Sequence, residues 1–205
     1  MNKIWLPHPT ILRGFEVELH PLQENHLEEL FAAASDAELW RLTPSDCSKR
    51  EKFFEMYEAA IKALADGKEY PFVIVHKTSG KLIGSTRFFD IFPEHRKLEI
   101  GWTWITREFW GTAVNLECKL LLLKFCFETL KTIRVQLKTN EKNIRSRTAI
   151  EKIGGKFEGI LRKDRIQDDG TLRNTAYFSI LVEEWNDAKN KILTQLAEKS
   201  AFYGK

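Results

Sequence analysis

The chain has 205 residues, 43% of them hydrophobic and 30% charged, which is the ordinary composition of one globular domain with its own core. The 32 basic and 29 acidic residues nearly cancel to a formal net charge of +3 without a block of like charge, so a nucleic-acid partner is not indicated. The most apolar run, residues 116–130, is interrupted by Glu117, Lys119, Lys124 and Glu128. It is too short and too charged to span a membrane, so no membrane partner is expected either.

The first part of the chain is predicted to form one strand and two helices. Residues 14–19 form the strand, residues 24–34 an amphipathic helix, and a second, longer helix ends near Ala65. Asp46 or Ser48 is expected to cap this second helix, because both are preferred N-cap residues. Residues 1–10, which contain Pro7 and Pro9, lack the apolar core of a signal peptide.

The rest of the chain alternates strands and helices. Predicted strands cover residues 71–76, 81–91, 97–105, 132–139, 156–165 and 172–181, and predicted helices cover residues 111–130, 141–153 and 183–199. No repeat, low-complexity tract or linker divides the chain, so a single domain over residues 1–205 is predicted. Its fold class is α/β (α+β), with a mixed central β-sheet flanked by helices.

The cysteines and histidines indicate neither disulfides nor a metal. The three cysteines form no Cys-x-x-Cys pair, so they are predicted to be reduced and buried, and a cytoplasmic location follows. The five histidines have no metal-like spacing, and no metal site is expected. These residues are Cys47, Cys118 and Cys126, and His8, His20, His26, His76 and His95.

The segment from Trp102 to Leu123 consists of a predicted strand, a short loop with Gly111 and the start of a long helix. The first N–H groups of a helix have no partner within it, and the helix dipole adds positive charge there, so a diphosphate can bind without Lys or Arg. Thr112 is expected to add a hydroxyl donor. The chain has neither a Gly-x-Gly-x-x-Gly nor a Gly-x-x-x-x-Gly-Lys-Ser/Thr motif, so the common nucleotide-binding loops are not indicated. An ordinary structural turn remains an equal alternative at this point.

A second polar segment follows the strand at residues 132–139. Asn143 and Ser146 are spaced to lie near one face of the next helix, where they offer an amide and a hydroxyl. The structural alternative is that Asn143 or Asn140 caps this helix.

Three motifs taken together resemble the GNAT superfamily of N-acetyltransferases, and more narrowly its branch of ribosomal-protein N-terminal acetyltransferases (RimJ/RimL-like). The motifs are Leu98-Glu99-Ile100-Gly101-Trp102-Thr103-Trp104, the run from Trp110 to Lys119, and Asn143-x-x-Ser146 with Gly154. The resemblance extends over residues 14–185.

The resemblance implies a GNAT-like fold with splayed middle strands, and acetyl-CoA as co-substrate in the V-shaped opening between residues 100–105 and 133–139. Cofactor contacts are implied for three groups of residues. Backbone groups of Trp102, Thr103 and Trp104 would pair with the pantetheine arm. Asn143 would contact the pantetheine or the acetyl-bearing end, and Ser146 would lie near the thiol. The pyrophosphate would be held by the amides of Trp110, Gly111, Thr112, Ala113, Val114 and Asn115.

The implied reaction is direct attack of a neutral amine on the thioester in a ternary complex. A backbone N–H of the Trp102–Trp104 strand would stabilise the oxyanion. Glu99, directly or through water, is the candidate base, and Ser146 or a water the candidate acid. Alternative interpretations are that Glu99 faces solvent, that Ser146 only bonds its own helix, and that one of the two tryptophans belongs to the core.

The chain departs from the family pattern in the loop. Ala113 and Asn115 stand where the family has small residues, usually glycine or alanine, and cofactor binding is retained if Ala113 is helical. No tyrosine occupies the usual acid position.

The predicted function is therefore acetyl-CoA-dependent N-acetylation of a primary amine, such as a protein N-terminus. A small-molecule amine as acceptor and a non-catalytic CoA-binding sensor or interaction module are the alternatives. The acceptor pocket is expected from residues 27–42, 88–95 and 164–174, and a homodimer is left open.

Overall fold

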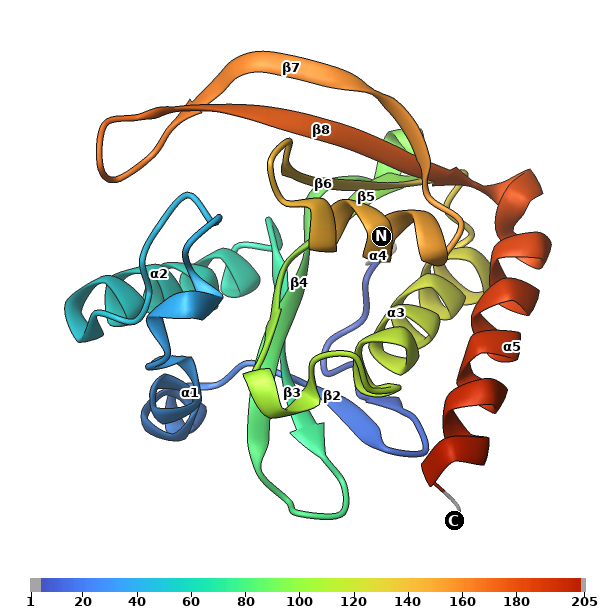
Figure 1. Cartoon of the computed structure of the whole chain (residues 1–205), viewed down its shortest axis with the longest axis horizontal. Coiled ribbons are helices and arrows are strands. Elements are labelled where there is room, and N and C mark those ends of the chain that lie inside the picture. Colours follow the sequence, from blue (N-terminus) through green and yellow to red (C-terminus); the bar gives the residue numbers. More distant parts are fainter. Residues whose placement is uncertain (1–4, 204–205) are drawn as a thin grey trace.

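The computed structural model describes residues 5–203, with side chains up to residue 199; the outermost ends of the predicted domain, residues 1–4 and 204–205, lie outside the described residues. Within residues 5–203, eight strands form one sheet in the order β1-β2-β3-β4-β5-β6-β8-β7 (Figure 1). Only β5 and β6 are parallel, so the sheet is mixed as predicted. The strands are β1 (Leu12–Arg13), β2 (Val17–Pro21), β3 (Tyr70–His76), β4 (Leu82–Phe92), β5 (Lys97–Ile105), β6 (Arg134–Asn140), β7 (Lys156–Ile166) and β8 (Leu172–Leu181).

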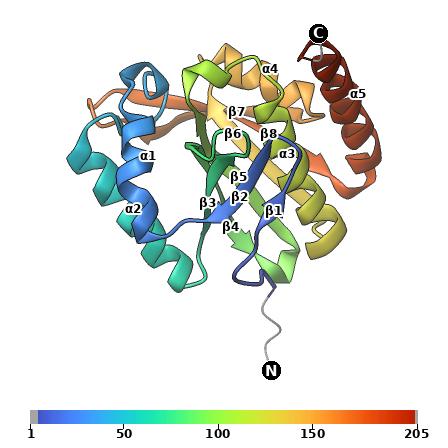
Figure 2. The same cartoon turned by 90° about the horizontal axis from the view of Figure 1, so that it is seen from below.

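Helices cover both faces of the sheet. Helices α1 and α2 lie on one side of the strands, and α3 and α5 lie on the other (Figures 1 and 2). The helices are α1 (Leu27–Ala34), α2 (Arg50–Ala65), α3 (Val114–Lys124), continued by a π-helical turn (Phe125–Leu130), α4 (Ile144–Lys152) and α5 (Trp185–Tyr203). Short 3-10 turns cover Glu24–His26, Ala37–Leu39, Pro93–His95, Arg107–Phe109 and Val182–Glu184.

Two hydrophobic clusters lie on opposite faces of the sheet. The larger one joins α3 and α5 to residues such as Leu98 and Ile100 of β5, and the smaller one joins α1 and α2 to residues such as Trp104. Regular alternation would place Trp104 on the same face as Leu98 and Ile100, but an extra residue in β5 between Gly101 and Trp104 reverses the alternation, so β5 contributes to both clusters. The free, buried cysteines agree with the sequence prediction.

The predicted order of elements is confirmed, but several boundaries are wrong. The predicted helix at residues 111–130 begins only at Val114, because Gly111 has a left-handed φ of 79° that no α-helix accommodates. The first long strand begins at Val17 rather than at residue 14. The cap predicted for α2 is also wrong, since Lys49 occupies that position without a side-chain hydrogen bond.

The middle of the sheet opens between β5 and β6, as the resemblance implied. The two strands pair at three positions, ending at Glu99 and Gln136, whereas β4 continues to pair with β5 as far as Ile105. The edge of β5 from residue 100 to residue 105 therefore has no strand beside it among the described residues. This opening faces the start of α3 and α4 in the view of Figure 1.

Candidate active site

A β-bulge distorts β5 just beyond the point where β6 diverges. Ser85 pairs with Trp104 and Arg87 with Gly101, so the single residue Thr86 lies opposite both Trp102 and Thr103. Trp102 has a left-handed φ of 50°, which is unusual for a residue of this size. Bulges turn backbone groups out of the regular ladder and concentrate near active sites.

The two tryptophans of β5 have different environments. Trp104 is buried under α2, where its indole N–H donates to the Tyr57 hydroxyl over 2.6 Å. Trp102 is only half-buried, and the guanidinium of Arg87 lies 5.0 Å from its ring centre. The expectation that one tryptophan belongs to the core is therefore confirmed for Trp104. Trp102 remains at the opening.

The loop before α3 presents free backbone donors. Among the described residues, the amides of Asn115 and Leu116 have no acceptor, as is usual for the first turn of a helix. Ala113 is helical, with φ −71° and ψ −22°. The loop therefore does not need a glycine at this position, which was the condition for cofactor binding to be retained. The expected role of the Thr112 hydroxyl is wrong, because it donates to the Phe109 carbonyl over 2.8 Å.

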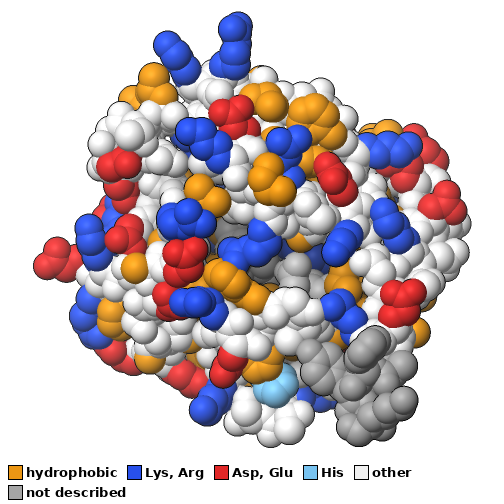
Figure 3. Space-filling view, in the orientation of Figure 1, with side chains coloured by type: hydrophobic (Ala, Val, Ile, Leu, Met, Phe, Trp, Pro, Cys, Tyr) orange, Lys and Arg blue, Asp and Glu red, His pale blue; other side chains and the backbone are white. Residues whose placement is uncertain are grey.

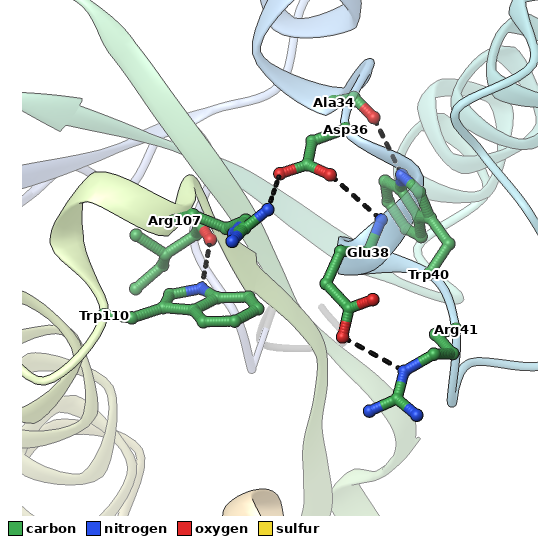
Figure 4. A network of polar contacts seen from close by, with 8 residues as sticks. Ala34, Asp36, Glu38, Trp40, Arg41, Arg107 and Trp110 are labelled. Carbon is green, nitrogen blue, oxygen red and sulfur yellow. Dashed lines mark hydrogen bonds and ion pairs between the residues drawn. The ribbon is translucent and has the colours of Figure 1, made fainter.

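Gly111 leaves this loop open towards its surroundings. A Cβ atom built on Gly111 would meet nothing within 4 Å, so a ligand can approach the backbone here. On one side of the loop, Trp110 is fixed by donation from its indole N–H to the Ile105 carbonyl over 2.8 Å (Figure 4). Arg107 links the loop to the segment after α1 through an ion pair of 3.4 Å with Asp36.

Trp110 also connects the loop to the start of α4. The Arg145 guanidinium lies 3.4 Å from the centre of the Trp110 ring, a stacked cation–π arrangement. Beside it, a cleft of about 250 Å³ separates α4 from the segment after α1, with the cations Arg41, Lys142 and Arg145 and the single anion Glu38 in its lining. Lys and Arg side chains surround the hollow near the middle of this face (Figure 3). The positive charge suits an anionic ligand.

Asn143 and Ser146 lie at the start of α4, as predicted, but they interact with each other. The Asn143 side-chain oxygen accepts the Ser146 backbone N–H over 3.0 Å, so Asn143 is the N-cap of the helix. The capping alternative is confirmed for Asn143, and only its amide nitrogen remains free for a ligand. Among the described residues, the Ser146 hydroxyl makes no hydrogen bond.

Glu99 is fully buried, with 0% of its surface exposed, so the interpretation as a solvent-facing residue is wrong. Its Oε2 accepts from Gln136 over 2.7 Å and pairs with the Lys138 ammonium over 2.9 Å. Burial raises the pKa of Glu99, and Lys138 acts in the opposite direction. Its other oxygen, Oε1, is buried and has no partner. Glu99 therefore retains one free acceptor atom.

No hydrogen bond or ion pair joins Glu99 to Ser146 in the described part of the chain, so the two predicted catalytic residues do not form a unit. Sequence reasoning also missed the buried charges Arg87 and Lys119, which are 4% and 7% exposed. Lys119 donates to Thr103 in the bulge over 2.7 Å. In the sequence, Lys119 is a charged residue within the apolar run 116–130. That position excludes a membrane span, and it could also have indicated a buried charge.

No group of His, Cys, Asp and Glu in residues 5–203 is arranged to hold a metal ion. In the same part of the chain, no helix combines the length and apolarity needed to cross a membrane.

The mixed sheet with splayed strands, the bulge and the free amides at a helix start form the arrangement that the resemblance to the acetyltransferases implied. Residues 16–156 match the family described as "Acetyltransferase (GNAT) domain", and the chain belongs to this family. The predicted family is thereby confirmed.

Similar proteins of known sequence or structure also carry names of N-acetyltransferases. A Bacillus subtilis (strain 168) protein named "Putative ribosomal N-acetyltransferase YdaF" is 33% identical over 110 residues, which is 54% of this chain and 59% of that protein. The match thus spans about three fifths of the length of this relative. A GCN5-related N-acetyltransferase from Brucella melitensis is 28% identical with a TM-score of 0.84, covering 93% of this chain and 86% of that one.

Mycobacterium smegmatis RimJ, solved in complex with CoA-disulfide, has a TM-score of 0.78 over 94% of this chain and 96% of that one. Its identity is 19%, so it shows a similar fold. The name of the Bacillus protein agrees with the predicted branch of ribosomal-protein acetyltransferases.

Proposed function

We propose that this protein transfers an acetyl group from acetyl-CoA to a primary amine, with a protein N-terminal amine as the acceptor. The observation that carries the proposal is the free edge of β5 from residue 100 to residue 105, which contains the bulge at Trp102. An extended pantetheine arm can pair with such an edge as an added strand does. The bulge takes Trp102 and Thr103 out of the regular pairing with β4, which supports an oxyanion site at a backbone N–H there.

The residues at the opening fit acetyl-CoA. The free amides of Asn115 and Leu116 suit the pyrophosphate, and the open space at Gly111 lets it approach. The Asn143 amide nitrogen is available to the pantetheine arm. The cations Arg41 and Arg145 line the neighbouring cleft and complement the negative charge of the cofactor. When bound, acetyl-CoA supplies an activated thioester for acyl transfer.

The protein's own contribution is to position the reactants and to move protons. The acceptor amine enters as an ammonium ion and must lose a proton before it attacks. The unpartnered Oε1 of Glu99 can take this proton, directly or through one water, while Lys138 and Gln136 fix the other oxygen. The side chain of Glu99 lies on the sheet face opposite Leu98 and Ile100, so we place the acceptor on that face, away from α3.

The choice of acceptor rests on two supports. The similar Bacillus protein carries a name that refers to ribosomal N-acetylation. The β7–β8 hairpin also extends past the sheet, and its tip contacts the segment after α1, where the Asp168 N–H donates to the Pro44 carbonyl over 3.2 Å (Figure 1).

The test is to mix the protein with acetyl-CoA and either short peptides with free N-termini or small amines, and to follow thiol release. We expect release with peptides, and mass spectrometry should place the acetyl group on the N-terminal nitrogen. Release only with small amines would overturn the acceptor assignment. Thermal stabilisation by acetyl-CoA without turnover on any acceptor would indicate a CoA-binding sensor, and no stabilisation at all would refute both functions.

A sharper prediction concerns Gly111→Glu. The new carboxylate would face the diphosphate, so the Kd for acetyl-CoA should rise at least about tenfold, which corresponds to about 1.4 kcal/mol. Gly111→Gln is the matched control, because it has the same size and the same backbone strain at φ 79° but no charge. Isothermal titration calorimetry on both variants measures the difference. Equal Kd values for the Glu and Gln variants would refute the placement of the pyrophosphate.

A further inference from the structure

Helix α3 carries a lysine that points into the protein rather than into water. Lys119 is 7% exposed, and no carboxylate among the described residues lies within ion-pair distance of its ammonium group. Its hydrogen bond, over 2.7 Å, goes to the Thr103 hydroxyl. A buried ammonium without a counter-ion destabilises the fold, so stability does not account for this residue.

The contact of Lys119 lies in the bulge itself. Thr103 is one of the two residues opposite Thr86, and the hydroxyls of Thr103 and Thr86 are 2.7 Å apart. The ammonium and the two hydroxyls thus form a continuous hydrogen-bonded chain that runs from α3 through Thr103 of β5 to Thr86 of β4. Thr103 and Lys119 lie on the α3 side of β5, whereas Glu99 lies on the opposite side, where we place the acceptor.

We infer that Lys119, acting through the Thr103 hydroxyl, supplies the proton that the departing CoA thiolate takes up. This role rests on the proposed function. The amine nitrogen bonds to the thioester carbon, the C–S bond breaks, and its electron pair goes to sulfur. Sulfur takes the Thr103 hydroxyl proton while Thr103 takes one from Lys119. The acceptor nitrogen releases two protons, one from the ammonium ion before attack and one after the C–N bond has formed. Both leave by way of Glu99 and water, and Lys119 regains a proton from solvent after the products depart.

The electrostatics of Lys119 suit this task. Burial lowers the pKa of Lys119 to about 8, close to the ordinary thiol value of about 8.5. A donor matched in this way transfers a proton readily near neutral pH. Cys118 is the one titratable neighbour that shifts the pKa, in the upward direction. Glu117, the next charge along α3, is occupied by the backbone N–H groups of residues 15–17.

Lys119 also changes the role expected for Ser146. The Ser146 hydroxyl has no hydrogen bond to a proton source among the described residues, so it can orient the thiol but cannot replace the proton it gives. Thr103 has such a source in Lys119. Lys119 is thus a positioning and proton-supplying residue that acts through Thr103.

The test uses two pairs of variants in the full chain. Lys119→Met removes the proton, whereas Lys119→Arg keeps a cation that cannot give its proton at neutral pH. Thr103→Val removes the linking hydroxyl, whereas Thr103→Ser keeps it. We expect kcat to fall about 10- to 100-fold in the Met, Arg and Val variants, with little change in the Kd for acetyl-CoA, and Thr103→Ser to recover most of the loss. The exposed Lys124→Met on the same helix is the control and should retain the wild-type kcat.

The pH profile adds an independent measurement. The donor must be protonated, so the wild-type kcat should fall as pH rises through about 8, and this limb should be absent in Lys119→Met. A wild-type rate and profile in Lys119→Met, or recovery by Lys119→Arg, would overturn this inference alone. If Lys119→Met does not fold, equal rates of Thr103→Val and wild type would overturn it. Absence of thiol release by the wild-type protein would instead refute the proposed function, and this inference with it.

Discussion

At the scale of single residues, two buried glutamates differ in whether their carboxylate oxygens are already hydrogen-bonded within the protein. Glu117 accepts the N–H groups of Glu16 and Val17 over 2.8 and 3.0 Å and also that of Phe15, so its carboxylate holds the start of β2 against α3. A Cβ on Gly14 would lie 2.6 Å from this carboxylate, which explains the glycine. Glu117 is fully engaged. Glu99 is also buried but keeps one oxygen without a partner, which is the difference expected between a structural and a reactive carboxylate.

Glu99→Gln tests this difference. A base acts only as the carboxylate, so activity should fall as pH drops through the pKa of Glu99, which burial raises above the ordinary value. The wild-type profile of kcat/KM should therefore show an acid limb at a higher pH than an ordinary glutamate gives. In Glu99→Gln this limb should vanish, and kcat should be at least about tenfold lower. The exposed Glu94→Gln is the control. An unchanged acid limb in Glu99→Gln would exclude Glu99 as the base.

At the scale of elements, the sequence predicted well what depends on neighbouring residues. The run of β-formers from Lys97 to Ile105 predicted β5 with its observed bounds, and Gly154, with φ 94°, ends α4 where expected. The bulge could not be predicted, because it depends on the register between β4 and β5, and Trp102 to Trp104 look like regular alternation. The burial of Lys119 likewise depends on where α3 meets the sheet.

The start of α2 shows how a local signal misleads. Asp46 and Ser48 were predicted as caps, but the Asp46 carboxylate accepts both the N–H and the hydroxyl of Ser48, over 3.1 and 2.6 Å. Their polar atoms are thus used in a turn before the helix. Lys49 is left at the N-cap position, extended and without a cap bond, and its positive charge is also unfavourable at a helix N-terminus.

Lys49→Ser should therefore stabilise the protein. Serine at this position can accept an N–H of the first turn, which is worth about 1 kcal/mol and corresponds to about 2–4 °C in Tm for a domain of this size. Lys49→Ala removes the charge without adding a cap, so the difference between the Ser and Ala variants isolates the capping bond. Thermal unfolding followed by circular dichroism measures both. A Tm for Lys49→Ser no higher than that of Lys49→Ala would show that the helix start is not as described.

At the scale of the whole molecule, the last hairpin connects the two ends of the fold. β7 and β8 belong to one end of the sheet, yet their turn reaches the segment between α1 and α2. Two contacts hold it there, the Asp168 N–H to the Pro44 carbonyl and a longer contact of 3.4 Å between Ser45 and the Asp168 carboxylate. The arch passes over the face on which we place the acceptor. The same contacts fix the β7–β8 turn and the segment between α1 and α2 relative to each other.

Asp168→Pro should open this arch without unfolding the protein. Gly170 donates to the Gln167 carbonyl over 2.9 Å, so Asp168 is the first central residue of the turn, a position that proline favours. The substitution keeps the turn but removes the N–H that binds Pro44. Hydrogen exchange in residues 40–49 should become faster, and KM for a peptide acceptor should rise several-fold while the Kd for acetyl-CoA stays the same. Asp168→Ala, which keeps the N–H and loses only the longer contact, should change both much less. Equal exchange rates in the Pro and Ala variants would mean that the backbone bond does not hold the arch closed.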